Sequence, residues 1–387
     1  MRVVIVGAGP VGSLLAAELA RLGVEHLTLE ARATPGAGTR AIGIHSAALR
    51  AMSPSGATDR ILDRALRVSE GEARIDGRTI ATIRFDRART GSLASFPFVA
   101  TLPQEATEAA IAATAASHGA VEPQRGCRVT RVIDDGPSCR VVTDRGDVRG
   151  DVVVIAAGSR SRSISDLTHD GRRRAYPDRY VMADVRDDTG EGPRAIVHLH
   201  RDGVLESFPL PGGLRRFVAW HRPRPPESSL EDADALRAAL TVRAGVAADG
   251  VATATGFGVG RFTARRMHRG RVFAIGDAAH EVSPIGGQGL NLGLIDAATL
   301  APLLADWGRT GQPPPQLSAW ERRRRDAART ASRIAALNTV AGRGHGSLGA
   351  AARHAGIRLA PARLLAHAYG MGFDPDAREG SLTPQTR

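Results

Sequence analysis

The chain has 387 residues, 42% of them hydrophobic and 24% charged, which is the composition of an ordinary globular protein with room for two or three structural units. All 52 basic residues are arginine, and the formal net charge is +12. This charge favours anionic cofactors, acidic substrates or an acidic carrier protein, although a compositional bias towards Arg, Ala and Gly is the plainer explanation. Nucleic acid is not expected as a partner, because only 4% of residues are aromatic and no binding motif is recognised.

The two cysteines, Cys127 and Cys139, match no metal or redox spacing, so we expect free thiols in a reducing compartment and no metal site. The apolar N-terminus is not interpreted as a signal peptide, because glycines interrupt it and Glu18 falls inside the next helix. No stretch approaches the ~20 apolar residues of a membrane span. A cytoplasmic protein without membrane contact is therefore predicted.

The N-terminus carries a dinucleotide-binding pattern. An apolar run at Val3 to Val6 is typical of a buried parallel strand, and a glycine-rich turn and a helical pattern follow it. The next strand, His26 to Leu29, ends at Glu30, about 20 residues past the glycines, where a carboxylate binds ribose hydroxyls. A purely structural glycine turn is the alternative. The expected cofactor residues here are Gly7 for the tight turn, Gly9 for close approach of a pyrophosphate, Gly12 for helix packing, Pro10 and Val11 between them, and Glu30, Ala31 and Arg32.

Further along, Arg40 follows the ribose-binding strand and is a candidate to neutralise a phosphate. Residues 71–99 alternate as strands around Asp76-Gly77, which is a hairpin signal. A helix is predicted from Gln104 to Gly119, and the amide of Gln104 is placed to face a ligand at its start. Three more strands are expected, at Val129 to Ile133, Arg140 to Thr143 and Val152 to Ile155.

Residues 166–264 differ from what precedes them, because strand-like runs separated by Gly and Pro turns dominate. One helix candidate interrupts them, Asp232 to Arg243. This pattern predicts a separate, mostly antiparallel unit. The glycines from Gly256 to Gly260 lack the spacing of a second nucleotide site and are interpreted as strand or turn.

A second glycine loop follows the strand Arg271 to Ile275. It begins with Gly276-Asp277, contains Pro284 and three further glycines, and leads into an apolar helix, Leu290 through Leu304. Such a loop brings backbone N–H groups and a helix N-terminus close to a flat, electron-rich ligand. A last long helix is expected from Trp320 to Leu337, with its basic run Arg322 to Arg325 facing solvent, and residues 341–387 are expected to form small helices and a polar tail.

Taken together, these features resemble the single-component FAD-dependent aromatic hydroxylases, the para-hydroxybenzoate hydroxylase-like flavoprotein monooxygenases, over about residues 1–340. The residues that carry the resemblance are Gly7, Gly9, Gly12 and Glu30; Arg40, Ala41, Gly43 and Gln104; and Gly276, Asp277, Ala278, Ala279, His280, Pro284, Gly287, Gln288, Gly289 and Asn291.

The resemblance implies an α/β fold: a Rossmann-like FAD-binding domain (residues 1–70, 100–165 and 265–320), an inserted, mostly antiparallel β-sheet substrate domain (71–99 and 166–264), and C-terminal helices and tail (321–387). It also implies that Arg40 and Gln104 flank the pyrophosphate and ribityl–isoalloxazine region, and that Asp277 binds the ribityl chain or the pyrophosphate side. Pro284 is implied to lie beside the flavin ring, and the backbone of Gly289, Leu290 and Asn291 to meet its pyrimidine edge. Gly276 and Gly287 of the same motif are further expected cofactor-binding residues.

By the same resemblance we expect a monooxygenase that inserts one oxygen atom of O2 into an aromatic or polyketide-like small molecule, of the kind met in antibiotic biosynthesis. FAD, reduced by NADPH or NADH, would carry the oxygen as a C4a-(hydro)peroxyflavin. Pro284 and His45 are the candidate catalytic residues. His198, His200 and His221 are also candidates, but histidines in a β-rich unit are more often structural. Monomer and homodimer are both left open.

One departure from the family pattern concerns the segment after the third strand. Family members usually carry Asp-Gly there, associated with FAD and nicotinamide binding, whereas this chain has Ala157-Gly158, and Ile164 stands nearest the motif arginine. The departure bears on reduction by the nicotinamide more than on FAD binding. Two alternatives therefore stay open: a flavoprotein with structural FAD that catalyses a non-redox cyclisation or rearrangement, and a flavin-dependent reductase or dehydrogenase.

Overall fold

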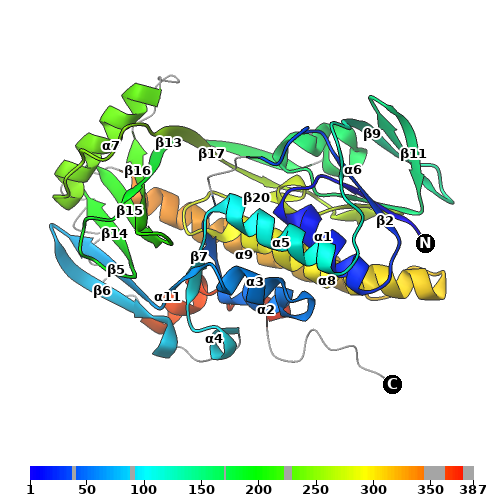
Figure 1. Ribbon diagram of the computed structural model, residues 1–387, viewed down its shortest axis with the longest axis horizontal. Helices are drawn as coiled ribbons and strands as arrows, with labels where there is room; N and C mark the ends of the chain where they lie inside the picture. Colours follow the sequence, from blue (N-terminus) through cyan, green and yellow to red (C-terminus); the bar gives the residue numbers. More distant parts are fainter. Residues whose placement is uncertain (37–40, 88–91, 170, 222–228, 344–361, 378–387) are drawn as a thin grey trace.

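The computed structural model describes residues 1–36, 41–87, 92–169, 171–221, 229–343 and 362–377. Two large sheets stand at opposite ends of the molecule, and four long helices run between and beneath them (Figure 1). The expected Arg40 contact falls outside the described residues. The long helices are α1 (Pro10–Arg21), α5 (Gln104–Ser117), α8 (Gln288–Thr310) and α9 (Leu317–Gly342).

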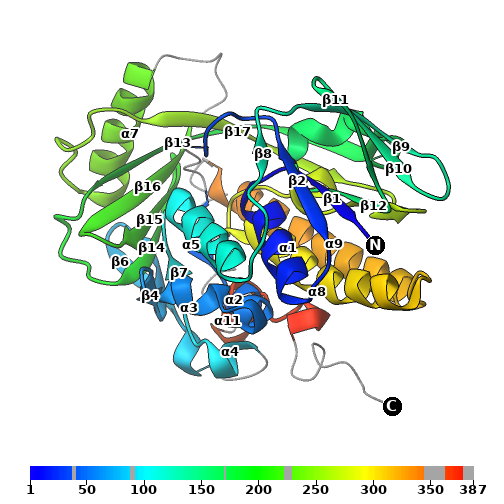
Figure 2. The ribbon, with the colours of Figure 1, turned by 45° about the vertical axis from the view of Figure 1, so that its right-hand side comes forward.

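The first sheet is six-stranded and parallel except at one edge, as in a Rossmann-like fold. Its central strands are buried along their whole length, which explains why the first strand is a run of valine and isoleucine without alternation. Helices α5 and α8 pack on either side of α1 (Figure 2). In order across the sheet the strands are β18 (His268–Arg269), β19 (Val272–Ala274), β12 (Val152–Ile155), β1 (Val3–Val6), β2 (His26–Glu30) and β8 (Gln124–Arg125).

The second sheet is eight-stranded and antiparallel except where β14 pairs with β5. Its hairpin between β5 and β6 turns at Asp76 and Gly77, both with positive φ, as the sequence predicted. Helix α7 (Ser229–Ala244) covers the face that carries Val181 and Phe217. In order the strands are β20 (His280–Glu281), β17 (Thr255–Thr263), β13 (Arg172–Arg186), β16 (Leu214–His221), β15 (Gly203–Leu210), β14 (Arg194–His200), β5 (Glu70–Ile75) and β6 (Arg78–Arg84).

The α/β architecture predicted from the sequence is confirmed: a Rossmann-like sheet, a mostly antiparallel second sheet and C-terminal helices. The residues at which the domains divide stay a prediction. Two three-stranded sheets complete the strands: β9 (Val129–Asp134), β10 (Cys139–Thr143) and β11 (Gly146–Gly150), and β3 (Gly43–Ile44), β7 (Val99–Thr101) and β4 (Leu66–Val68).

The short helices are α2 (Ser46–Met52), η1 (Ser53–Ser55), α3 (Ala57–Leu62), η2 (Phe85–Arg87), α4 (Ser92–Ser95), η3 (Ser159–Ile164), α6 (Asp166–His169), η4 (Gly276–Ala278), α11 (Ala362–Tyr369) and η5 (Pro375–Ala377). Of the short helices, η2, η3, η4 and α11 contribute residues to the wall of the cavity described below.

Both cysteines are buried free thiols, and burial raises the pKa of Cys139 to about 12.

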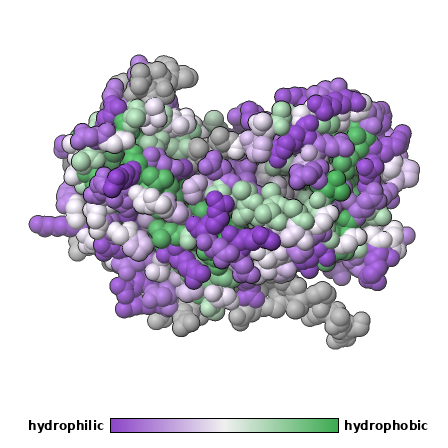
Figure 3. All heavy atoms as spheres, in the orientation of Figure 1, coloured by the Kyte–Doolittle hydropathy of each residue, from purple (hydrophilic) through white to green (hydrophobic). Residues whose placement is uncertain are grey.

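The basic run of α9 is not uniformly solvent-facing. Arg324 is completely buried, so the expectation of a solvated run was wrong for this residue. Its guanidinium pairs with carboxylates of α8 and of the segment after α11, which compensates the charge. The face drawn in Figure 3 is mostly hydrophilic, with hydrophobic residues in separate patches. In the described part of the chain, no helix is both long and apolar enough to cross a membrane.

Candidate active site

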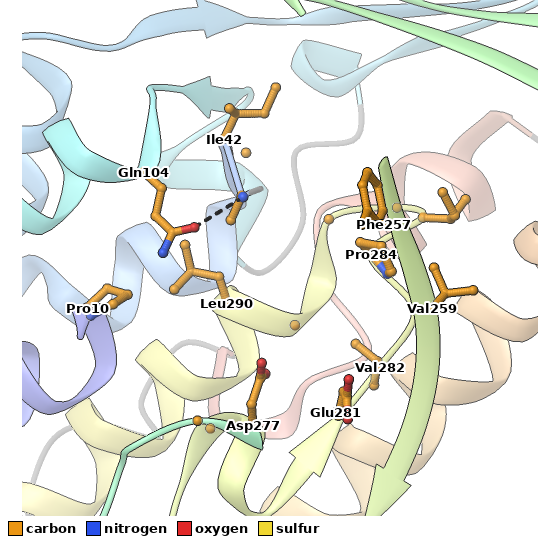
Figure 4. A pocket seen from close by; sticks show the side chains of 18 of the residues that line it. Pro10, Ile42, Gln104, Phe257, Val259, Asp277, Glu281, Val282, Pro284 and Leu290 are labelled. Atoms are coloured by element: carbon orange, nitrogen blue, oxygen red, sulfur yellow. Dashed lines mark hydrogen bonds between the residues drawn. The ribbon is translucent and has the colours of Figure 1, made fainter. Parts of the chain in front are cut away.

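One continuous cavity of about 1060 Å³ joins the two large sheets. At one end it is bordered by the residues that follow the carboxyl ends of β1, β2, β12 and β19, the edge at which open α/β sheets bind ligands. At the other end it is bordered by one face of the eight-stranded sheet. Figure 4 shows Pro284 next to Phe257 and Val259 of β17, with Gln104 on the opposite side.

The turn between β1 and α1 is shaped by its glycines. A Cβ atom on Gly7 would lie 2.7 Å from Ala157 Cα, and one on Gly12 would lie 1.9 Å from the carbonyl oxygen of Gly7. A Cβ on Gly9 would meet nothing within 4 Å, so this glycine opens onto the cavity. Gly9 is also the residue before α1 and, because it has no side chain, it cannot cap the first-turn N–H groups. This arrangement suits a pyrophosphate.

Glu30 stands at the end of β2, where two backbone hydrogen bonds fix the orientation of its carboxyl group. Its Oε2 accepts a hydrogen bond from the N–H of Ala8 at 2.8 Å, and its Oε1 accepts from the N–H of Arg32 at 2.9 Å. Burial raises the pKa of Glu30, but the hydrogen bonds from Arg32 and Ala8 lower it further, so that it lies below its usual range. The carboxyl group is therefore an ionised acceptor that lines the cavity.

Gln104, the first residue of α5, links two parts of the cavity wall. Its Oε1 accepts a hydrogen bond from the N–H of Ala41 at 3.3 Å (Figure 4), and its Nε2 donates to Glu108 Oε1 at 2.9 Å. Glu108 also lines the cavity, and burial raises its pKa. Glu108 was not identified in the sequence, although it stands one helical turn after Gln104 and so on the same face of α5.

Asp277 enters the cavity from the loop between β19 and β20, in the short helix η4. Arg162 Nη2 donates to the carbonyl oxygen of Asp277 and to Glu281 Oε2, both at 2.8 Å. The Arg162 guanidinium also lies 4.0 Å from the ring centroid of Phe262. Arg162 stands two residues before Ile164, so an arginine of the η3 segment does reach the Gly-Asp loop in this chain.

The loop before α8 brings a second helix N-terminus to the cavity. Pro284, Gly287, Gly289 and Leu290 all line it, and α8 begins at Gln288 without a side-chain cap. The first turn of α8 therefore lies at the cavity wall, where its N–H groups favour negative charge on a ligand.

Asn291 and His45 hold this loop in place. Asn291 Oδ1 accepts from the N–H of His45 at 2.8 Å, and its Nδ2 donates to the carbonyl oxygens of Gly43 at 2.9 Å and Gly287 at 2.8 Å. His45 borders the cavity, and its Nδ1 donates to the carbonyl oxygen of Tyr369. Burial holds the pKa of His45 below its usual range, so its ring is neutral near pH 7.

The residues present fit FAD. Two uncapped helix N-termini, an ionised carboxylate at the end of β2 and an open glycine turn occupy one cavity, and each matches a different part of a dinucleotide. Of the expected cofactor residues, Gly12 and Asn291 lie behind the cavity wall, where Gly12 permits packing and Asn291 ties the loop. Those that border the cavity are Gly7, Gly9, Pro10, Val11, Glu30, Ala31, Arg32, Gln104, Gly276, Asp277, Pro284, Gly287, Gly289 and Leu290.

Several residues that line the cavity were not identified from the sequence. Cys127 and Arg128, between β8 and β9, border the end of the cavity that lies at the six-stranded sheet. They reach this position because β8 pairs with β2, a long-range contact that the local sequence does not show. Tyr369 reaches the cavity from a helix more than 300 residues from its partner His45, and no short-range pattern signals that contact. His198 is not on the cavity wall, and burial lowers its pKa to about 4.

Comparison with known proteins agrees with this geometry. The profile of the FAD binding domain family matches residues 1–335. The chain is 30% identical over 315 residues to rifampicin monooxygenase of Streptomyces venezuelae, covering 78% of this chain and 63% of that protein. It is 28% identical over 352 residues to dialkyldecalin synthase of Streptomyces rugosporus, covering 87% and 72%.

Among solved structures, p-nitrophenol 4-monooxygenase PnpA from Pseudomonas putida DLL-E4 matches with a TM-score of 0.84 at 23% identity, covering 97% of this chain and 98% of that chain, which shows a shared fold. The chain spans about three fifths of the length of several curated relatives that it matches, rifampicin monooxygenase included. Because the family profile covers most of the chain, the protein belongs to the FAD-binding domain family, as the resemblance to the FAD-dependent aromatic hydroxylases predicted.

Proposed function

We propose that the protein is an FAD-dependent monooxygenase that inserts one oxygen atom of O2 into an aromatic or polyketide-like small molecule, with NADPH or NADH as the reductant. The observation that carries the proposal is the single cavity: its dinucleotide end opens without interruption into an apolar end over the eight-stranded sheet. A cofactor and an organic substrate can therefore meet inside the protein, away from bulk water.

The shape and lining of the apolar end support a rigid, largely hydrophobic substrate. Its walls include Met182, Val197, Phe208, Val218 and Phe257, from five different strands. Such surfaces favour the burial of ring systems, because apolar area removed from water stabilises the complex by roughly 25 cal/mol per Å². Rifampicin monooxygenase, a relative of this chain, is named for a large substrate of natural-product type.

Bound FAD supplies the redox and oxygen chemistry, and the chain supplies binding, orientation and electrostatics. Glu30 and the first turn of α1 would hold the adenosine and pyrophosphate, and Asp277 would bind on the ribityl side. The first turn of α8 would stabilise negative charge at the pyrimidine edge of the ring. We propose that Pro284 borders the reacting face, and that His45, neutral and buried, acts by positioning the loop that carries Pro284.

One relative favours a second candidate function. Dialkyldecalin synthase is named for ring synthesis and not for oxygen transfer. Ala157, which lines the cavity where family members usually carry aspartate, is consistent with a flavoprotein that makes little use of a nicotinamide. In this second candidate, FAD stabilises the fold and the same apolar end templates a cyclisation.

Flavin reduction separates the two candidates. The purified yellow protein is mixed anaerobically with NADPH or NADH in a stopped-flow instrument, with and without a set of aromatic ligands. The proposal predicts bleaching of the flavin absorbance with at least one nicotinamide, and faster bleaching when a suitable ligand is bound. A flavin that keeps its absorbance under every condition would sink the monooxygenase assignment and favour the cyclase.

A further inference from the structure

Glu206 lies in the middle of the apolar floor of the cavity. It belongs to a row that crosses six neighbouring strands, and in this row each residue pairs with the next: Met182 with Val218, Val218 with Glu206, Glu206 with Val197, Val197 with Ala73, and Ala73 with Ala81. All six members of the row border the cavity. Five of them are apolar, so Glu206 is the one ionisable group in this row.

The carboxyl group of Glu206 has no hydrogen bond or ion pair within the described part of the chain, although the residue is only 8% exposed. Another carboxylate of the same sheet shows the usual arrangement. Glu72, 9% exposed, accepts from Arg74 Nε at 2.7 Å, from Thr79 Oγ1 at 3.0 Å and from Arg194 Nη1 at 3.3 Å. A buried carboxyl group without such partners is costly to the fold, which points to a ligand that completes it.

The groups around Glu206 narrow the kind of ligand. Tyr369, on the same cavity wall, and Tyr180 both have their pKa raised, first by burial and then by the charge of Glu206. Arg216 borders the cavity in the adjacent row of the sheet. Its Nε donates to Asp184 Oδ1 at 2.5 Å, and its Nη2 donates to Asp184 Oδ2 at 2.7 Å. The apolar floor of the cavity therefore presents the carboxyl group of Glu206 as a hydrogen-bond acceptor, whereas the charge of Arg216 is already neutralised by Asp184.

The position of Glu206 also relates it to the proposed flavin site. Tyr369 is a neighbour of both: a Cβ atom on Gly286, in the loop before α8, would be 3.8 Å from Tyr369 Cε1, and burial and then the charge of Glu206 raise the pKa of Tyr369. The same loop carries Pro284, the residue proposed to border the reacting face of the cofactor. A substrate whose ring system lies against Pro284 would thus direct a substituent at its far end towards Glu206.

We propose that Glu206 is the substrate anchor of this cavity: its carboxyl group accepts a hydrogen bond from a hydroxyl or amino group on an otherwise apolar ring system. Above about pH 7, where Glu206 is ionised, the anchor selects hydrogen-bond donors at that end of the substrate and rejects carboxylates there, because two buried anions repel. The inference rests on the proposed function, since it places the substrate in the same cavity.

Binding can be tested without turnover. The FAD-loaded protein is titrated anaerobically at a pH well above about 7, where Glu206 is ionised, without a nicotinamide, with naphthalene, anthracene and tetracene skeletons that each carry a hydroxyl, amino, methoxy or carboxylate group. Binding is followed by calorimetry and by perturbation of the flavin absorbance. We expect each bound skeleton to bind about tenfold or more tightly as the hydroxyl or amino form than as the methoxy form, and the carboxylate form to bind most weakly.

Two variants identify the anchor. Glu206→Leu, which continues the apolar row, should abolish the preference for donors and strengthen binding of the methoxy compounds. Glu206→Gln should keep much of the preference for hydroxyl compounds, because the amide oxygen still accepts, and should lose the rejection of carboxylates. Asp202→Asn, in the exposed turn before β15, is the matched control and should leave all preferences unchanged. An unfolded Glu206→Leu protein would leave Glu206→Gln to decide.

The proposal is overturned if donor preference is the same in Glu206→Leu as in the parent, or if no hydroxyl- or amino-bearing compound binds. These outcomes are distinct from failure of the proposed function. A protein with Glu206-dependent donor preference that never bleaches with NADPH or NADH supports the anchor and contradicts the monooxygenase. Oxygen transfer to a substrate that binds equally well to Glu206→Leu does the opposite.

Discussion

Asp296 of α8 and Arg324 of α9 form an ion pair with neither residue exposed, and Asp296 Oδ1 accepts from Arg324 Nε at 2.7 Å. The other oxygen of Asp296 accepts from the N–H of Gly276 at 3.0 Å and from His280 Nε2 at 2.6 Å. Arg324 also pairs with Asp374 at 2.7 Å. One buried pair therefore joins two long helices, the segment after α11 and the Gly-Asp loop of the candidate site.

Removing the arginine should be strongly destabilising. Arg324→Met fills the space but leaves Asp296 and Asp374 as buried carboxylates without their main counter-ion. We expect the free energy of unfolding to fall by about 3–5 kcal/mol, and bound FAD to be lost more readily because the Gly-Asp loop loses its anchor. Urea unfolding and the ratio of flavin to protein after gel filtration measure the two effects.

Arg329→Ala is the matched control on the same helix. Arg329 pairs with Asp326 at the surface, with both side chains at least half exposed. This change should cost less than about 1 kcal/mol and leave FAD content unaltered. If the two variants lose the same stability, the buried network does not have the role assigned to it.

Glu30 should matter for FAD affinity more than for folding. Glu30→Ala removes an ionised acceptor at the end of β2, and with it the partner of the Ala8 N–H. A hydrogen bond to a charged group is worth about 1.5–3 kcal/mol, so the dissociation constant for FAD should rise roughly tenfold to a hundredfold. Fluorescence titration of apoprotein with FAD measures it. Glu25→Ala, at an exposed carboxylate near the start of β2, should bind FAD as the parent does, and an unchanged affinity in Glu30→Ala would remove Glu30 from the site.

Asn291 should act on the shape of the site without contacting the ligand. Asn291→Ala leaves the N–H of His45 and the carbonyl oxygens of Gly43 and Gly287 without this partner. Each such group costs about 1–3 kcal/mol when buried and unsatisfied, so we expect lower thermal stability together with weaker FAD binding. Differential scanning fluorimetry with and without added FAD tests this. A fully stable variant with normal FAD affinity would contradict the role.

Glu206 gives the fold a specific pH dependence. Burial raises its pKa from 4.5 to about 7, with the phenol groups of Tyr180 and Tyr369 as its ionisable neighbours. Between these pH values the folded protein holds a proton that the unfolded chain has released, so this contribution to stability is full below pH 4.5 and is lost as pH rises through about 7.

Glu206→Gln lacks this titration. It should equal the parent in stability near pH 4.5 and exceed it above about pH 7, by roughly 3 kcal/mol. Urea unfolding of both proteins across this range measures the difference, in which the contributions of all other groups cancel. A difference that stays constant with pH would show that the pKa of Glu206 is not raised in the folded protein.

Much of the fold could be predicted from local pattern. The apolar run at Val3–Val6, the glycine turn after it and the carboxylate at Glu30 form a signal with fixed spacing, and the Asp76-Gly77 hairpin is a two-residue signal. The loop around Asp277 is equally local. In each case the chemistry lies within one strand, turn and helix, so the sequence order reproduces the spatial order.

What could not be predicted depends on long-range pairing. Arg324 stands in a run of four arginines, and nothing within the run shows that this one lies between α8 and the segment after α11. Glu206 follows apolar residues in β15, but only the register of six strands shows that it lacks a partner and faces the cavity. The contact of His45 with Tyr369 likewise joins distant segments.

The central claim is oxygen transfer by a flavin held in this cavity, and isotope labelling tests it most directly. The aromatic compound that most accelerates flavin bleaching is incubated with the protein, a nicotinamide and ¹⁸O2, and the product is analysed by mass spectrometry. The account predicts one ¹⁸O atom in each product molecule. A product formed without label, or formed equally well with neither oxygen nor a nicotinamide, would contradict it.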